Sequence, residues 1–166
     1  MYIQQSELFW GMNRDFVKEV MNIAEKESYK IGDFLFREGD PATNFYILIK
    51  GRVKLTIGET GQMVHIVDRA GEAFGWSSLI ERDVYSASGE CKQETILQKF
   101  DSRALLKLVE EDLVNGLIFM KRLAGLIGKR LIWSYKMITS SSQASVSMTG
   151  GTSQIEVSEA AAIEQV

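Results

Sequence analysis

Residues 71–87, GEAFGWSSLIERDVYSA, combine the residue types from which a small-molecule site can be built. Glycines open and interrupt the segment, and Ser77 and Ser78 follow where a helical turn is expected to begin. The first N–H groups of such a turn have no partner within it and could face a bound anion. The candidate ligand-binding residues are Gly71, Glu72, Phe74, Gly75, Trp76, Ser77, Ser78, Arg82, Tyr85, Ser86 and Ala87.

Two further side chains, His65 and Cys91, are the only ones of their kind in the chain. A single imidazole could ligate haem iron, but the sequence suggests no second ligand nearby, so a packed or surface histidine is the favoured interpretation. A single cysteine forms no internal disulfide, which fits a reducing compartment. Because no nucleophile constellation, acid–base pair, metal motif or phosphate loop is present, we predict no enzymatic activity, metal or cofactor.

The distribution of charge argues against nucleic acid as a partner. The formal net charge of −3 arises from Glu156, Glu159 and Glu164, so residues 1–138 carry 19 basic and 19 acidic side chains. A balanced surface has no field that would steer a polyanion. The N-terminus lacks the pattern of a secretory signal, and basic residues interrupt the most apolar stretch, residues 113–133. We therefore expect a cytoplasmic protein without a membrane span.

Apolar periodicity predicts one helix followed by a series of short strands. Asn13 has the residue type of an N-cap, and helical spacing continues over residues 13–26. Beyond Ser28, alternating or apolar runs are separated by turn residues at spacings of about 8 to 12 residues, which is typical of an antiparallel jelly roll. The chain is expected to be mainly β with flanking helices, with a double-stranded β-helix to about residue 100. The expected strands include residues 34–36, 44–49, 53–57, 63–67, 85–90 and 95–100.

Helical periodicity returns after residue 100. Asp101 is expected to cap a short helix, and a long helix is expected over residues 113–138. One row of its apolar residues, spaced alternately by three and four, has the pattern of a coiled-coil seam. A second row, which includes Phe119 and Leu123, lies on a neighbouring face, so one row could face a partner helix while the other packs on the strands. The predicted homodimer interface comprises Leu113, Leu117, Met120, Ala124, Ile127 and Leu131.

The long helix contains glycines, and a polar segment follows it. Gly116, Gly125 and Gly128 each cost about 1 kcal/mol relative to Ala within a helix, so we expect close backbone approach there. Residues 139–166 are rich in Ser, Gly and other small residues and are predicted to form a flexible, low-complexity tail. The expected organisation is one domain over residues 1–138, with its helices at 101–138, followed by this tail.

The order of these parts resembles that of the cyclic nucleotide-binding domain superfamily, in particular the N-terminal sensor domains of Crp/Fnr-type bacterial regulators. The resemblance covers residues 7–138 and is carried by GDFLFREGD at 32–40, FYILIKGRV at 45–53 and GEAFG at 71–75. It implies a jelly-roll sensor that dimerises through the long helix. Such regulators normally continue into a helix-turn-helix domain, whereas a polar, acidic segment follows here, so we expect no DNA binding by this chain.

Two positions depart from the pattern of the nucleotide-binding members. Those members have an acidic residue after the glycine that corresponds to Gly75, which takes the ribose 2′-hydroxyl, and an arginine about ten residues later, which pairs with the cyclic phosphate. This chain has Trp76 and Tyr85 there. Loss of the phosphate partner alone would weaken binding about a hundredfold. Arg82 could substitute, although a solvated charge is favoured, and Trp76 could either stack on a planar ligand or fill the ribose space.

These observations predict a small-molecule-sensing regulatory domain that does not bind cAMP in the usual way. The sequence does not name the effector, and neither a cyclic nucleotide nor haem is favoured. The ligand could bridge residues 71–87 and the long helix, where Asn115 or Lys121 could supply the contact. A shift of that helix could then pass the signal to a protein partner. Two alternatives stay open: a true cAMP or cGMP binder with atypical contacts, and a non-sensing scaffold whose pocket is filled by Trp76 and Tyr85.

Overall fold

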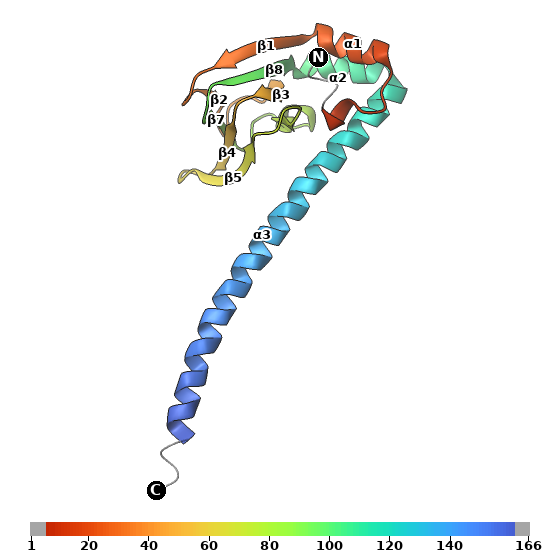
Figure 1. Ribbon diagram of the computed structural model, residues 1–166. Coiled ribbons are helices and arrows are strands. Elements are labelled where there is room, and N and C mark those ends of the chain that lie inside the picture. The colour runs from red at the N-terminus through yellow and green to blue at the C-terminus, as the bar shows by residue number, and fades with distance from the viewer. Residues whose placement is uncertain (1–5, 162–166) are drawn as a thin grey trace. The chain divides into compact units, whose positions relative to one another are not determined.

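The computed structural model describes residues 6–161, with side chains described over residues 6–139. The chain divides into two compact units, Met1–Gly125 and Leu126–Val166. Helix α3 (Leu113–Ala161) begins in the first unit and continues into the second (Figure 1). The other elements all belong to the first unit: η2 (Glu7–Phe9), α1 (Arg14–Asn22), β1 (Ala24–Tyr29), β2 (Phe34–Phe36), β3 (Asn44–Lys50), β4 (Val53–Ile57), β5 (Gln62–Val67), β6 (Ala73–Phe74), η3 (Trp76–Leu79), β7 (Ser88–Cys91), β8 (Thr95–Asp101) and α2 (Ser102–Glu111).

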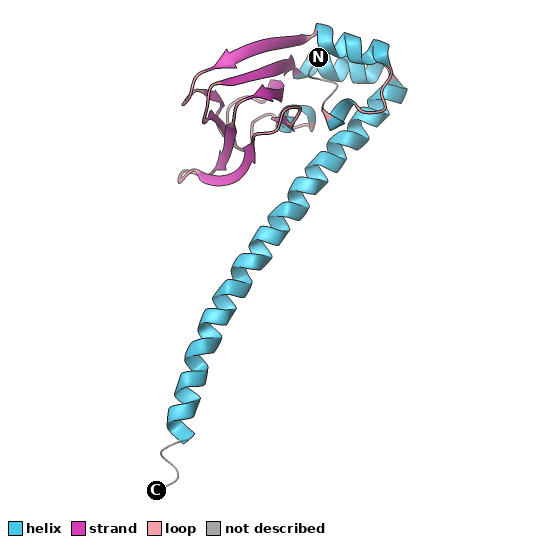
Figure 2. Cartoon of the chain, viewed as in Figure 1, coloured by secondary structure: helices cyan, strands magenta, loops and turns pink. Residues whose placement is uncertain are grey.

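The strands form two antiparallel sheets, drawn in magenta in Figure 2. The sheet orders are β1-β8-β3-β6 and β2-β7-β4-β5. Side chains of both sheets meet in one buried cluster, as expected for two sheets packed face to face. The mainly-β jelly roll with flanking helices is therefore confirmed. The cluster contains Tyr46, Leu48, Phe74 and Leu97 from the first sheet and Phe36, Val53, Leu55, Val67 and Cys91 from the second, together with Tyr85.

The first sheet is also buried on its other face. Residues 45–49 of β3 are all buried, so this strand reads as a continuous apolar run instead of alternating. The ring centroids of Phe45 and Phe100 lie 6.1 Å apart on neighbouring strands. Gln98 Nε2 on β8 contacts Met21 Sδ of α1 at 3.9 Å, which places this helix against the outer face.

Helix α1 begins where the sequence predicts and ends earlier. The Oδ1 atom of Asn13 accepts a hydrogen bond from Phe16 N at 2.8 Å, which confirms the predicted N-cap. The helix ends at Asn22, so the expectation of a helix over 13–26 is wrong at its end. Residues 24–29 instead pair with β8 position by position, and this ladder of hydrogen bonds overrides the local helical preference.

The two C-terminal helices begin where the sequence predicts. Asp101 Oδ1 accepts from Ala104 N at 2.9 Å and so caps α2. Helix α3 continues to Ala161, past residue 138 where the apolar periodicity ends. The residues beyond contain no proline, and extending an existing helix costs less than nucleating one. For the tail predicted at 139–166, side chains after 139 and all of residues 162–166 lie outside the described part. Within residues 6–161, no helix combines the length and apolarity needed to cross a membrane.

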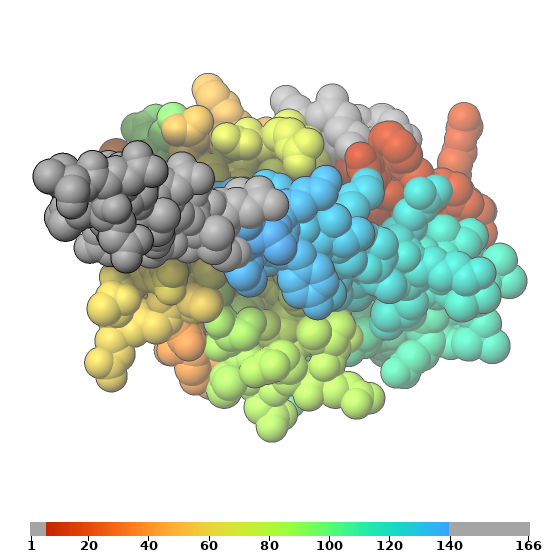
Figure 3. Space-filling view, turned by 90° about the horizontal axis from the view of Figure 1, so that it is seen from below, coloured from red at the N-terminus to blue at the C-terminus, as the bar shows by residue number. Residues whose placement is uncertain are grey.

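The two predicted apolar rows of α3 have different environments. Phe119 and Leu123 are buried, and the Phe119 ring centroid lies 6.0 Å from that of Phe9. Residues of the N-terminal segment, in red, lie against the beginning of α3, in cyan, in Figure 3. Leu113 and Leu117 of the seam row are 78% and 57% exposed. Of the other predicted interface residues, Ala124 and Leu131 are exposed, and Met120 and Ile127 are half-buried.

Close approach explains only one of the three glycines in α3. A Cβ at Gly116 would lie 2.1 Å from the carbonyl oxygen of Val109, at the end of α2. Any side chain there would therefore separate α2 from α3. Among the described residues, a Cβ built at Gly125 or Gly128 would have no atom within 4 Å apart from its chain neighbours and the nearby backbone of the same helix. The structure gives no packing reason for glycine at those two positions.

Candidate ligand site

The segment 71–87 runs along strand β3 on its way from β5 to β7. Gly71 N donates to the carbonyl oxygen of Leu48 at 2.8 Å, and Leu48 N donates to that of Glu72 at 2.9 Å. The two residues of β6 then pair with the middle of β3. The first part of the segment is therefore held by backbone hydrogen bonds, and its side chains are positioned by the sheet.

Gly75 marks a close approach of the segment to β3. Its φ is 78°, in the left-handed region, and a Cβ would lie 2.9 Å from Cδ2 of Tyr46. The carbonyl oxygen of Asn44 would be 3.4 Å away. Glycine is the residue that tolerates both the backbone conformation and the contact. Gly75 thus has a structural reason that requires no ligand.

The serines of the segment have partners inside the protein. Ser78 Oγ donates to the carbonyl oxygen of Gly75 at 3.0 Å, and Ser78 N donates to the same oxygen at 3.3 Å. Ser77 is buried, and its Oγ lies 3.3 Å from Ser86 Oγ. The Ser78 N–H group, which was expected to face an anion, is therefore directed at a carbonyl of η3's own turn.

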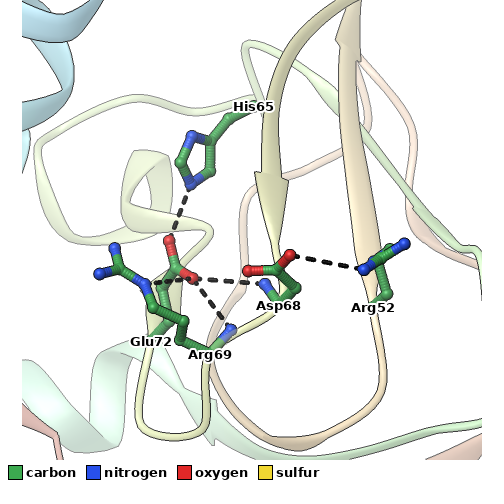
Figure 4. Close-up of polar contacts among 5 residues, drawn as sticks. All are labelled: Arg52, His65, Asp68, Arg69 and Glu72. Atoms are coloured by element: carbon green, nitrogen blue, oxygen red, sulfur yellow. Dashed lines mark hydrogen bonds and ion pairs between the residues drawn. The ribbon is translucent and has the colours of Figure 1, made fainter.

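Glu72 is the centre of a small polar cluster shown in Figure 4. Its side chain is 11% exposed, and Oε1 lies 2.7 Å from Nε2 of His65 on β5. Oε2 accepts from the backbone N–H groups of Asp68 and Arg69, each at 3.4 Å, and lies 3.9 Å from Arg69 Nε. Asp68 also pairs with Arg52 across 3.7 Å. The predicted ligand residue Glu72 thus closes the turn between β5 and β6, and His65 has a carboxylate partner.

Tyr85 closes the other end of the segment. The residue is 4% exposed, its hydroxyl donates to the carbonyl oxygen of Asn44 at 2.7 Å, and Asn44 N donates to the hydroxyl at 3.0 Å. The ring stacks on Phe36, with centroids 4.1 Å apart and planes at 19°. Tyr85 is one of the residues expected to contact a ligand. Its side chain instead enters the space between the sheets.

The aromatic packing around Tyr85 is continuous. Tyr46 stacks on Phe74 with centroids 5.3 Å apart, and Phe36 lies 5.6 Å from Tyr46. Burial raises the pKa of Tyr46, and the neighbouring charge of Tyr85 and a hydrogen bond to it raise that pKa further. Burial also raises the pKa of Tyr85 and of Cys91, which belongs to the same cluster. The interior is an apolar medium in which a charged group is costly.

Hydrogen bonds between residues 83–85 and the turn at 39–42 explain where β7 begins. A strand was expected over 85–90, but β7 covers Ser88–Cys91. Tyr85 N donates to the carbonyl oxygen of Asp40 at 2.9 Å, and Gly39 N donates to that of Tyr85 at 3.0 Å. Residues 83–85 are therefore bonded to the 39–42 turn and are not part of the main ladder.

The remaining candidate residues differ in their accessibility. Arg82 is exposed, Trp76 and Ala87 are half-buried, and Phe74 is buried in the inter-sheet cluster. Asn115, suggested as a ligand contact from the long helix, is buried, with Oδ1 accepting from Asn13 N at 3.0 Å. Over residues 6–139, no three His, Cys, Asp or Glu side chains gather in a cluster that could hold a metal ion.

Sequence reasoning missed two partners of this site. Asn44 and Phe36 contact Tyr85 from β3 and β2, and nothing local in their sequence marks either as a partner of residue 85. The signal that could have found Phe36 is strand alternation, because alternate residues of a strand lie on the same face of the sheet. The Asn44 contact uses backbone atoms, so its side chain gives no signal.

Comparison with known proteins agrees with this architecture. Residues 26–112, just over half of the chain, match the family model described as the cyclic nucleotide-binding domain. Human cGMP-dependent protein kinase 2 is 33% identical over 52% of this chain. The match covers only 12% of the kinase, so this chain corresponds to a small part of that protein.

Solved structures share the fold. A cyclic nucleotide-binding domain from Methylobacillus flagellatus superposes with a TM-score of 0.72 at 24% identity, covering 82% of this chain and 78% of that one. The catabolite activator protein of Thermus thermophilus gives a TM-score of 0.66 at 24% identity, covering 80% of this chain and 62% of that one. At this level of identity the two structures establish the fold of the sandwich and its flanking helices.

Proposed function

The chain belongs to the cyclic nucleotide-binding domain family, and from that premise we propose that it is a Crp/Fnr-type regulatory module whose effector is not an ordinary cyclic nucleotide. The observation that carries the proposal is Tyr85. At the position that the family resemblance assigns to the phosphate-binding arginine, the chain has a neutral phenol whose hydroxyl is bonded to Asn44. A cyclic phosphate would find no cation there.

The charge of the segment 71–87 supports the same proposal. It contains three acidic residues and one basic residue, Arg82, which is exposed. The partly buried Glu72 carboxylate is the acidic group nearest the start of the segment. A charge-assisted hydrogen bond is worth about 1.5–3 kcal/mol, so its absence weakens phosphate binding about 10- to 150-fold. An effector without a phosphate charge fits this segment better than a nucleotide.

Signal transmission is proposed to occur through a homodimer. Leu113 and Leu117 are largely exposed, although they begin the row with seam spacing. Burying an apolar side chain of this size stabilises an association by about 1.5–3 kcal/mol, so an uncovered row of this kind favours a partner helix. An effector that alters the position of α3 would change how two copies pair. The balanced charge of residues 1–138 favours a protein as receiver of the signal.

A second candidate function is a scaffold without a ligand. It is favoured by the aromatic packing, because Phe36, Tyr46, Phe74 and Tyr85 are all buried and fill the space between the sheets. Replacement of Trp76 by Ala separates the two functions. A scaffold loses stability without any change in a ligand response, whereas a sensor changes the affinity for its effector.

Thermal unfolding of the full chain with cAMP or cGMP tests the proposed function. A ligand at about 100 times its Kd stabilises the folded state by about 2.7 kcal/mol, which shifts Tm by several degrees for a domain of this size. A concentration of ~1 mM is about 100 times a Kd of ~10 µM, so binding of that strength would be detected. We expect no shift in Tm at this concentration of either nucleotide. A clear shift with either nucleotide would establish the chain as a true binder with atypical contacts.

A further inference from the structure

The neutral charge of residues 1–138 is the sum of two opposite charges. Residues 1–112 carry 14 basic and 19 acidic side chains, a net charge of −5. Residues 113–138 carry no acidic side chain and five basic ones: Lys121, Arg122, Lys129, Arg130 and Lys136. This part of α3 is therefore a strongly basic helix that follows an acidic domain.

One face of α3 combines part of this charge with large exposed apolar side chains. Residues spaced as i, i+3, i+4 and i+7 share one side of a helix, and here they are Lys129, Ile132, Trp133 and Lys136. All four are exposed, Ile132 by 57% and Trp133 by 45%. Met137, 53% exposed, lies four residues after Trp133 and extends the apolar part. We call these five residues the outer face.

The outer face is separate from the predicted dimer seam. At 3.6 residues per turn, Lys129 and Trp133 each lie two residues from the seam residue Leu131 and are rotated from it by about 160° around the helix axis. A dimer joined through the seam would therefore leave the outer face exposed on each copy. Any partner of the outer face can bind in addition to a second copy of the chain.

Cations interleaved with large apolar side chains fit a lipid surface better than nucleic acid. At a bilayer interface, Trp and other apolar side chains enter the acyl boundary, while the ammonium groups of Lys remain among the headgroups. Protein–DNA interfaces are polar and wet, so they would give Ile132 and Trp133 no apolar environment. Because no described helix can cross a membrane, the contact is one with the surface of the bilayer.

We infer that the outer face of α3 binds the surface of an anionic lipid bilayer. The positive charge complements anionic headgroups, and the same headgroups repel the acidic residues 1–112, so the charge asymmetry orients the protein with α3 towards the bilayer. The face is short, about 12 Å from Lys129 to Met137, so the binding is reversible. The inference goes beyond the proposed function, because it requires neither an effector nor a change in residues 71–87.

Vesicle flotation of the full chain at about 50 mM salt tests the inference. The vesicles consist of phosphatidylcholine with about 30% phosphatidylglycerol, and the neutral controls of phosphatidylcholine alone. One basic residue near an anionic surface increases partitioning about fivefold, so Lys129 and Lys136 together contribute about 30-fold. We expect the chain to bind the anionic vesicles at least about 30-fold more tightly than the neutral ones. No binding to the anionic vesicles, or equal binding to both, would overturn the inference.

Paired lysine variants show whether the position of the charge matters. Lys129→Gln with Lys136→Gln should weaken binding to the anionic vesicles about 30-fold, and Gln preserves the helix. Lys18→Gln with Lys26→Gln removes the same charge from two exposed lysines of the acidic domain and should leave binding unchanged. If the two pairs have equal effects, binding depends only on net charge, and the outer face has no special role.

Trp133 tests whether the apolar part of the face enters the lipid. Trp133→Ala should weaken binding about tenfold or more, because a large apolar side chain no longer leaves water. The blue shift of tryptophan emission on adding anionic vesicles should also disappear. Trp10→Ala is the matched control, since Trp10 is 50% exposed but lies outside α3, and it should retain both binding and blue shift. Wild-type binding by Trp133→Ala would contradict insertion of the face.

Two further measurements identify another occupant of the outer face. If duplex DNA at equal phosphate concentration binds the chain more tightly than the anionic vesicles do, the face is a nucleic-acid site. If the Lys129→Gln and Lys136→Gln pair changes the mass in sedimentation, the face is a contact between copies of the chain. Either result would overturn the inference, whereas weaker binding to DNA and an unchanged mass support it.

Discussion

Replacement of Gly75 by Ala tests whether the segment 71–87 is pressed against β3. The new methyl group would lie 2.9 Å from Cδ2 of Tyr46 and 3.4 Å from the carbonyl oxygen of Asn44. The backbone at Gly75 has φ 78°, where an L-residue costs about 1–2 kcal/mol. The steric overlap adds about 1–3 kcal/mol, because Tyr46 is itself packed on Phe74 and Phe36. We expect the variant to lose about 2–5 kcal/mol of unfolding free energy.

Gly58→Ala is the matched control for this variant. Gly58 has φ 72°, and among the described residues a Cβ built there would have no atom within 4 Å apart from its two chain neighbours. The control therefore carries the backbone cost of about 1–2 kcal/mol without the overlap. Urea unfolding followed by far-ultraviolet circular dichroism measures both variants. Equal losses for Gly75→Ala and Gly58→Ala would show that the segment does not press on Tyr46, and would refute this account of the site.

Three further predictions concern the dimer, alkaline stability and the Glu72 cluster. The double variant Ile127→Asp and Leu131→Asp should sediment as a monomer where the wild type sediments as a dimer, and an unchanged mass would remove the seam as the interface. Burial raises the pKa of Tyr46 and Tyr85 above the ordinary 10.0 and that of Cys91 above 9.0, so the folded state retains protons that the unfolded chain releases. The stability they contribute is fully present below pH 9 and should be lost as pH rises past 9 to 10, which the urea midpoint measures; a flat profile up to pH 11 would contradict it. Glu72→Gln should lower the unfolding free energy by about 1–3 kcal/mol, whereas the exposed Glu19→Gln should change it by less than about 0.5 kcal/mol, and equal effects would show that the contacts of Glu72 contribute nothing.

Features set by neighbouring residues could be predicted from the sequence. The caps at Asn13 and Asp101 depend on contacts three residues away, and both are present. The strand 53–57 follows from alternating apolar residues and the strand 34–36 from a short apolar run between turns, and the bounds of both agree with the structure. Patterns of this kind are sufficient for the jelly roll, because burial on one face imposes the period of two.

Features set by distant residues could not be predicted in this way. The strand over 24–29 exists because β8 pairs with it, and no residue within it opposes a helix strongly. The bond between Tyr85 and Asn44 joins residues 41 positions apart and uses backbone atoms of Asn44. The resemblance marked Tyr85 as unusual for lacking a charge, but the use of its hydroxyl depends on a strand that only the folded chain brings near it.

Calorimetric titration of the full wild-type chain with cGMP and with cAMP tests the central claim most directly. The claim is that a cyclic nucleotide-binding fold with Tyr85 in place of a phosphate-binding cation does not hold an ordinary cyclic nucleotide. It predicts no saturable heat for either nucleotide in the micromolar range. Saturable binding of either one at micromolar or lower concentration would contradict it.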